Sequence, residues 1–203
     1  MSSASNQAET TTGRSRQKDL TRARLLEAAG RLVCAQGFLA FRTLDLARAA
    51  EVSHGTVFVH FPTREALLVA LVEERLAAVL RSIHARLESG ADIGTLLRQH
   101  LEGLAPHEEL YSWLVREQSG LPQELADALA GVNSTLSWHL TQAAARGRAA
   151  GTIKDVPDHF LFNCWIGLVH HYLANPGHFA PGASVIQTRG EELVRNFMNI
   201  ISR

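Results

Sequence analysis

Five residues near the start of the chain have types and spacing suited to hydrogen bonding with a nucleic acid: Thr43, Ser53, His54, Gly55 and Thr56. Hydroxyl and imidazole groups in the first turn of a helix can reach phosphates or base edges. Gly55 places no side chain there, so the backbone can approach a duplex closely. The chemistry is therefore recognition rather than catalysis, and it depends on the helices that carry these residues.

Three helices are predicted around these residues. Apolar residues at helical spacing predict a first helix over 19–36, which ends before Gly37. Thr43 is expected to cap a short helix to Ala50, and Ser53 to cap another that ends before Pro62. Two short helices joined by a four-residue turn are typical of a helix-turn-helix, whose second helix lies in the major groove.

The rest of the chain is predicted to be helical as well. No alternating strand pattern and no fixed-period repeat competes with the helical spacing. Together with the first three helices, this gives an all-α chain of about nine helices. The further helices are expected at 63–89, 92–104, 106–119, 122–150, 157–174 and 184–202.

Charge is distributed unevenly along a chain whose net charge is zero. Residues 1–64 carry nine Lys or Arg against five acids, whereas residues 65–203 carry eleven against fifteen. The first part can therefore attract phosphate, and the second part repels it. We expect a disordered arm with a basic end over 1–16, a helix-turn-helix domain over 17–64, and a larger helical domain over 65–203.

Several other classes of protein are disfavoured. No apolar run is long enough for a membrane span, and the N-terminus does not resemble a secretory signal, so we expect a cytoplasmic protein. We expect no metal and no cofactor. Cys164 and His171 lie seven residues apart beside His170, too far apart to chelate a metal without a third ligand. No nucleophile elbow, phosphate loop or HExxH spacing indicates an enzyme.

The segment from Thr21 to Leu67 resembles the DNA-binding domain of the TetR (tetracycline repressor) family. The residues that carry the resemblance are Leu25-Leu26, Ala28-Ala29, Leu32-Val33, Gly37-Phe38, Thr43, Leu46-Ala47, Ala50, Val52-Ser53, Gly55-Thr56-Val57-Phe58, His60-Phe61-Pro62, and Arg64-Glu65 with Leu67. The resemblance implies a dimer that binds double-stranded operator DNA. The expected DNA-binding residues are Lys18, Arg22, Arg42, Thr43, Ser53, His54, Gly55, Thr56, Phe58, His60 and Arg64.

Three residues depart from the family's pattern. Glu51 stands where the family usually has glycine in the turn, which predicts a strained backbone with positive φ. Phe58 replaces the usual tyrosine and lacks its hydroxyl, and His54 replaces the usual lysine or arginine. Because the recognition helix is weakly basic, we expect flanking residues to supply much of the attraction: Arg14, Arg16, Lys18, Arg22, Arg42, Arg48 and Arg64.

For the larger domain, the resemblance implies ligand binding and a dimer interface formed by the last two helices. Packing within one chain is the alternative for the same apolar residues. The expected interface residues are Leu161, Trp165, Leu168, Val169, Leu193, Val194, Phe197 and Ile201. The candidate ligand residues are large rings and nearby polar groups: Trp113, Glu117, Trp138, His139, Phe162, Asn163, Trp165 and Tyr172.

The function expected from the resemblance is that of a repressor. It would bind a palindromic operator as a homodimer and be released by a small molecule, hydrophobic or aromatic in character. An activator or a global DNA-binding regulator of the same fold is the nearest alternative, and a small helical enzyme is the alternative from another class.

Overall fold

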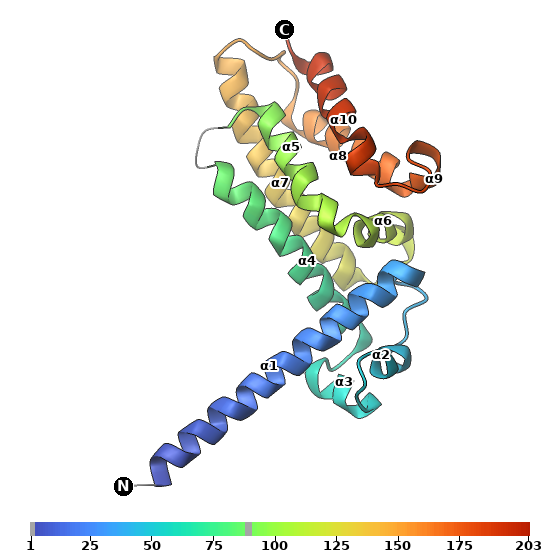
Figure 1. Cartoon of the computed structure of the whole chain (residues 1–203). Coiled ribbons are helices and arrows are strands. Elements are labelled where there is room, and N and C mark those ends of the chain that lie inside the picture. Colours follow the sequence, from blue (N-terminus) through green and yellow to red (C-terminus); the bar gives the residue numbers. More distant parts are fainter. Residues whose placement is uncertain (1–2, 88–90) are drawn as a thin grey trace. The chain divides into compact units, whose positions relative to one another are not determined.

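The computed structural model describes residues 3–87 and 91–203 (Figure 1). The chain divides into two compact units, Met1–Leu71 and Val72–Arg203. Their boundary lies within helix α4 (Arg64–Leu87), seven residues beyond the division expected between residues 64 and 65. The first two turns of α4 therefore belong to the first unit and complete its core.

The first unit contains α1 (Ser3–Gln36), α2 (Thr43–Ala49), α3 (His54–His60) and the start of α4. The arm expected to be disordered over 1–16 is helical from Ser3 onward in the structure. The segment contains no proline, and Ala, Gln, Glu and Arg are good helix formers, so it can continue α1 toward the N-terminus. Gly37, at φ 86°, follows the other end of α1.

Apolar side chains hold the first unit together. Leu25 and Val33 of α1 are completely buried, as are Leu46 of α2 and Leu67 of α4. Val57 is the buried residue of α3. Because α3 turns this one side chain into the core, the opposite side of the helix is left exposed.

The second unit contains the rest of α4 and all later helices. They are α5 (Ile93–Leu104), α6 (Glu108–Glu117), α7 (Gln123–Ala149), α8 (Asp158–Ala174), α9 (Pro176–Phe179) and α10 (Val185–Ile201), with 3-10 turns at Ala105–His107 and Gln118–Gly120. The predicted helices match these within a few residues, and the all-α class is confirmed. Short α9 was not predicted. The described residues contain no strand, only an isolated bridge between Ile153 and Ser202.

A carboxylate joins α6 to the start of α10. Glu108 accepts hydrogen bonds from the backbone N–H of Val185 at 2.6 Å and of Ile186 at 3.1 Å. It also accepts the hydroxyl of Ser184 at 2.5 Å, and Ser184 caps α10 by accepting from the N–H of Gln187. The donors at this helix end are thus satisfied from another helix.

No single helix of the described segments is long and apolar enough to cross a membrane. One bent pair, His54–His60 with Arg64–Arg81, meets the length and composition criteria only when the two helices are counted together.

Candidate nucleic-acid interface

Helices α2 and α3 pack against each other in the first unit and form the helix-turn-helix (Figure 1). Ser53 caps α3 as expected, because its hydroxyl accepts from the N–H of Thr56 at 3.1 Å. Thr43 does not cap α2. Arg42 occupies the cap position without a side-chain bond, and the Thr43 hydroxyl pairs with His54 Nε2 at 3.0 Å. This bond links the first turns of α2 and α3.

The solvent face of α3 is formed by His54, Gly55, Phe58 and Val59, all of them exposed. The Phe58 ring lies edge-on to the His54 ring, with centroids 5.0 Å apart. Val59 was not among the residues predicted to bind DNA. The signal for it was present in the sequence, because Val59 follows Gly55 by four residues and shares its face of the helix.

The strained turn residue that the sequence predicted is confirmed. Glu51 has φ 53°, and it is the one non-glycine residue with positive φ in the described chain. Its N–H donates to the Arg48 carbonyl at 3.2 Å, so the backbone reverses directly after α2. An L-residue in this conformation costs roughly 1–2 kcal/mol, because Cβ crowds the neighbouring carbonyl oxygen.

Replacing Glu51 by glycine is therefore expected to raise the free energy of unfolding by about 0.5–1 kcal/mol, since relief of strain outweighs the greater unfolded-state entropy of glycine. Guanidinium denaturation measures the change. Glu51→Ala is the matched control, because it removes the same charge but keeps Cβ. Equal stabilisation by both variants would contradict the strain argument and assign the effect to the carboxylate.

Lys18 and Arg22, two of the residues predicted to bind DNA, lie near His60. Burial lowers the pKa of His60, and the positive charges of Lys18 and Arg22 lower it further. The guanidinium of Arg22 lies over the Phe61 ring, 5.1 Å from its centroid. Lys18 and Arg22 remain exposed, so α1 places two cations beside the end of α3.

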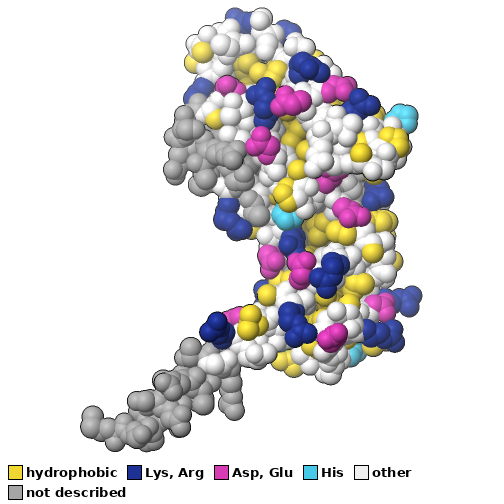
Figure 2. Space-filling model, viewed as in Figure 1, with side chains coloured by type: hydrophobic (Ala, Val, Ile, Leu, Met, Phe, Trp, Pro, Cys, Tyr) yellow, Lys and Arg dark blue, Asp and Glu magenta, His cyan; other side chains and the backbone are white. Residues whose placement is uncertain are grey.

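Arg64, predicted to bind a phosphate, is engaged inside the first unit. It donates through Nε to the Phe41 carbonyl at 3.1 Å and through Nη2 to the Phe38 carbonyl, and it pairs with Glu65 at 3.3 Å. Arg42 is exposed and lies directly before α2. Arg64 therefore holds the loop between α1 and α2, whereas Arg42 presents its side chain to solvent. Figure 2 shows Lys and Arg side chains on the surface of this unit.

Replacement of these two arginines by alanine is expected to have different results. Arg42→Ala should lower the slope of log affinity against log salt by about 1, because one phosphate contact is lost, with no change in Tm. Arg64→Ala should lower the free energy of unfolding by about 2 kcal/mol, because the partly buried carbonyls of Phe38 and Phe41 lose a charged donor. Salt titrations and thermal melts measure both. Arg31→Ala, at an exposed ion pair on α1, is the control. An unchanged slope for Arg42→Ala would contradict the phosphate role.

The candidate ligand residues of the second unit are only partly brought together. Trp138 and Phe162 line one hollow of about 530 Å³ between α7 and α8. Trp165 is completely buried, and His139 is buried beside the Trp138 ring. The others lie apart: Trp113 beneath the Arg116 guanidinium, Glu117 half-buried at the end of α6, Asn163 exposed, and Tyr172 stacked on Phe179.

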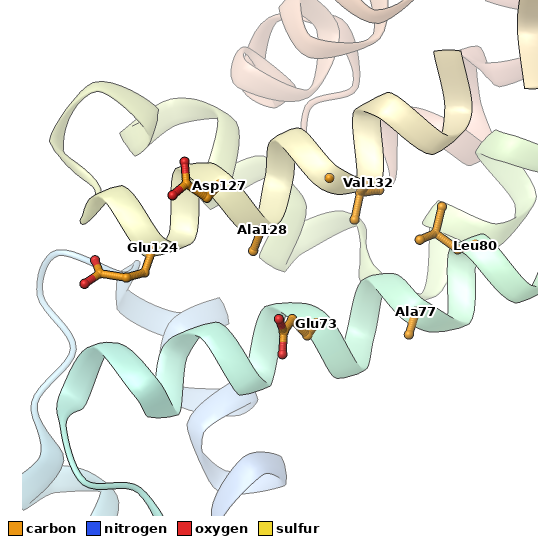
Figure 3. A pocket seen from close by; sticks show the side chains of 8 residues that line it. Glu73, Ala77, Leu80, Glu124, Asp127, Ala128 and Val132 are labelled. Atoms are coloured by element: carbon orange, nitrogen blue, oxygen red, sulfur yellow. The ribbon is translucent and has the colours of Figure 1, made fainter. Parts of the chain in front are cut away.

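A second hollow of about 650 Å³ lies between α4 and α7 (Figure 3). The carboxylates of Glu73, Glu124 and Asp127 stand at one end, and Leu80 and Val132 stand at the other. No residue predicted to bind a ligand lines this hollow. Its chemistry suits a molecule with one charged or polar end and one apolar end.

A buried polar cluster in the second unit was not predicted from the sequence. The indole N–H of Trp165 donates to His100 Nδ1 at 3.1 Å, and the Tyr111 hydroxyl pairs with His170 Nε2 at 2.8 Å. Burial lowers the pKa of His100 to about 4, with a smaller contribution from His170, and burial also lowers the pKa of His170 to about 4. Both imidazoles are therefore neutral near pH 7. The signal that could have revealed this cluster in the sequence is His100, a histidine on the apolar face of α5.

Most residues predicted to form the dimer interface lie inside the fold of one chain. Seven of the eight are buried, and only Leu168 is half-exposed. The apolar pattern marked the inward faces of α8 and α10, because a helix buries its most apolar face first. The exposed apolar residues on these helices are Phe160 and Ile200.

The histidines and cysteines do not assemble into a metal site where the structure describes them. No group of three or more His, Cys, Asp or Glu side chains is placed to hold an ion within that part of the chain. His170 faces Tyr111 instead, while Cys164 and His171 are exposed on α8.

Comparison with known proteins identifies the first unit most directly. Residues 25–71 match the model for bacterial regulatory proteins of the tetR family. No curated protein sequence matches the chain significantly. The matched segment ends at Leu71, where the first compact unit also ends.

Solved structures match nearly the whole chain. A putative transcriptional regulator from Saccharomonospora viridis in complex with choline has a TM-score of 0.75 at 20% identity, covering 91% of this chain and 99% of that one. A TetR family transcription regulator from Marinobacter aquaeolei has a TM-score of 0.65 at 22% identity, covering 93% and 98%. Salmonella enterica GusR has a TM-score of 0.69 at 20% identity, covering 89% and 92%. Residues 25–71 therefore match the tetR family of bacterial regulatory proteins, and the chain has the fold of TetR-family transcriptional regulators.

Proposed function

We propose that the protein is a transcriptional repressor that binds a palindromic operator as a homodimer and leaves it when a small molecule binds the second unit. The observation that carries the proposal is the helix-turn-helix of the first unit, in which α3 buries only Val57 and exposes the opposite face. Lys18 and Arg22 of α1 lie beside the end of that helix, and such cations can attract phosphate. The match to regulatory proteins favours this interpretation over a small helical enzyme. A cytoplasmic location follows, because the operator lies there.

Dimerisation is proposed through the exposed faces of α8 and α10. One seven-residue helix reads too few base pairs for a specific site, and paired half-sites about 34–36 Å apart solve this. Phe160 and Ile200 are 57% and 68% exposed, so both offer apolar surface to a second copy. Gly167 is exposed on the same helix as Phe160 and permits close approach.

The effector is proposed to bind in the second unit as a small molecule with an apolar or aromatic part. Trp138 and Phe162, which share the hollow between α7 and α8, support this choice. The α4–α7 hollow is a separate candidate site, and the carboxylates at one end of it would favour a positively charged molecule there. Choline, which the Saccharomonospora regulator holds, is therefore a suitable first probe.

Selection of duplexes from a random library, followed by footprinting and light scattering, tests the proposal. We expect an enriched palindrome with half-sites one helical turn apart, bound by two chains. A promoter–reporter fusion carrying this palindrome separates the alternatives. Lower expression supports a repressor, higher expression supports an activator, and unspecific coating of DNA without enrichment supports a global regulator. Absence of any duplex binding would overturn the proposal.

A further inference from the structure

The polar groups on the reading face of the helix-turn-helix are already paired with one another. The Ser53 and Thr56 hydroxyls lie 2.8 Å apart, and Ser53 also accepts from the N–H of Thr56. His54 Nε2 is bonded to the Thr43 hydroxyl. Helix α3 contains no Lys or Arg. It therefore lacks the bidentate guanidinium contact by which proteins most often recognise guanine.

The side chains that α3 exposes without a hydrogen bond are apolar. Val59 is 72% exposed, more than any other large apolar residue in the described chain, and Phe58 is 41% exposed. Val57 and Phe61, two residues before and two residues after Val59, are both buried. The exposure of Val59 therefore does not result from a lack of apolar surface to pack against. An isopropyl group that stays in water on a reading helix adds nothing to the stability of the free protein, and its surface can be buried only against an apolar surface of a partner.

The position of Val59 allows it to reach the bases. Gly55 and Val59 are four residues apart and share one face of α3, so their surfaces lie one turn apart. Because Gly55 has no side chain, the helix can approach the floor of the groove at that turn. Val59 would then meet the edge of a base rather than a phosphate.

We propose that Val59, assisted by the Phe58 ring, reads thymine through its C5-methyl group. In the major groove this methyl is the apolar feature that distinguishes thymine from the other bases. The inference rests on the proposed function, because it assumes that α3 enters the major groove of an operator. Under this proposal, each half-site has a thymine opposite Val59.

The test removes single methyl groups from DNA. Duplexes are first selected by the full-length protein, and each thymine of the selected site is then replaced by deoxyuridine, which pairs identically but lacks the methyl. At one position in each half-site we expect about a fourfold loss of affinity, and about fifteenfold when both half-sites are changed, the size expected for burying one methyl group per half-site.

The Val59→Ala variant connects the effect to this residue. It should bind the selected duplex more weakly than the wild type, and the deoxyuridine penalty at the identified position should disappear. Because Val59 is largely exposed, its truncation should leave Tm unchanged. Leu39→Ala is the matched control: it truncates an exposed leucine of the same unit outside α3, and it should keep the penalty.

The outcomes separate the inference from the function on which it rests. A specific duplex with no position sensitive to deoxyuridine, or a penalty that persists in Val59→Ala, overturns the thymine inference alone. A library that yields no enriched duplex overturns the proposed function, and the inference with it.

Discussion

Replacing Gly55 by leucine is expected to reduce operator affinity about a hundredfold, equivalent to ~3 kcal/mol, without lowering the stability of the protein. A Cβ at this position would meet only the Ser53 hydroxyl oxygen, at 3.8 Å, which is an ordinary contact, and the residue does not have positive φ. The fold therefore gives no reason for glycine at this position. The remaining reason is an external surface, because a leucine side chain would hold α3 away from the duplex.

The measurement is fluorescence anisotropy with the selected duplex at fixed salt, paired with a thermal melt. Leucine favours helix over glycine by up to about 1 kcal/mol, so Tm should stay the same or rise. Gly177→Leu is the matched control. Gly177 is also an exposed helical glycine, a Cβ added to it would meet no atom within 4 Å, and it lies on α9 in the other unit. Wild-type affinity in Gly55→Leu would show that α3 does not approach DNA at this turn.

Helical periodicity predicted most of the fold because most of these helices have one clear buried face. The apolar residues of α1, α4 and α10 recur every three or four positions, and glycine, proline or a capping residue marks the helix ends. Short α9 lacked this signal, since four residues are too few to show a period. Helix α1 extends through residues 3–16, where disorder was expected, and a polar composition does not by itself exclude helix.

The turn and the cap of α3 were predictable for different reasons. The positive φ of Glu51 followed from the resemblance, because the family usually has glycine at that position, whereas the cap is local, because Ser53 lies three residues before the N–H that it caps. The role of Arg64 in holding the loop could not be predicted in this way. Its carbonyl partners, Phe38 and Phe41, lie 26 and 23 residues earlier in the chain, and a sequence does not show which backbone carbonyls a side chain will contact.

The second unit shows where sequence patterns stop being informative. An apolar stripe shows that a helix face is buried, but packing within a chain and packing between chains select the same side chains. This explains why residues such as Trp165 and Phe197 were assigned to an interface although they contact each other inside one chain, with ring centroids 5.3 Å apart. The polar cluster also escaped prediction, because His100, Tyr111 and His170 come from three different helices.

That cluster leads to the second large effect, a loss of stability in acid that His100 controls. His100 Nδ1 accepts the Trp165 indole proton, so the ring must stay neutral with its proton on Nε2. Its pKa falls from 6.5 to about 4 through burial. The folded state therefore binds fewer protons than the unfolded state. The stabilisation is complete above pH 6.5 and is lost progressively as the pH falls to 4, by about 3 kcal/mol.

Replacing His100 by glutamine tests this assignment, because the amide oxygen can still accept from Trp165 but does not titrate. Between pH 6.5 and 4 the variant should lose less stability than the wild type, by up to ~1.4 kcal/mol per pH unit, since one fewer proton is taken up on unfolding. Urea denaturation followed by tryptophan fluorescence provides the profile. His178→Gln, at an exposed histidine of α9, should follow the wild-type curve. Parallel profiles for wild type and His100→Gln would mean that acid unfolds the protein through other groups, with His170 the next to replace, since it shares the cluster and its pKa also falls to about 4.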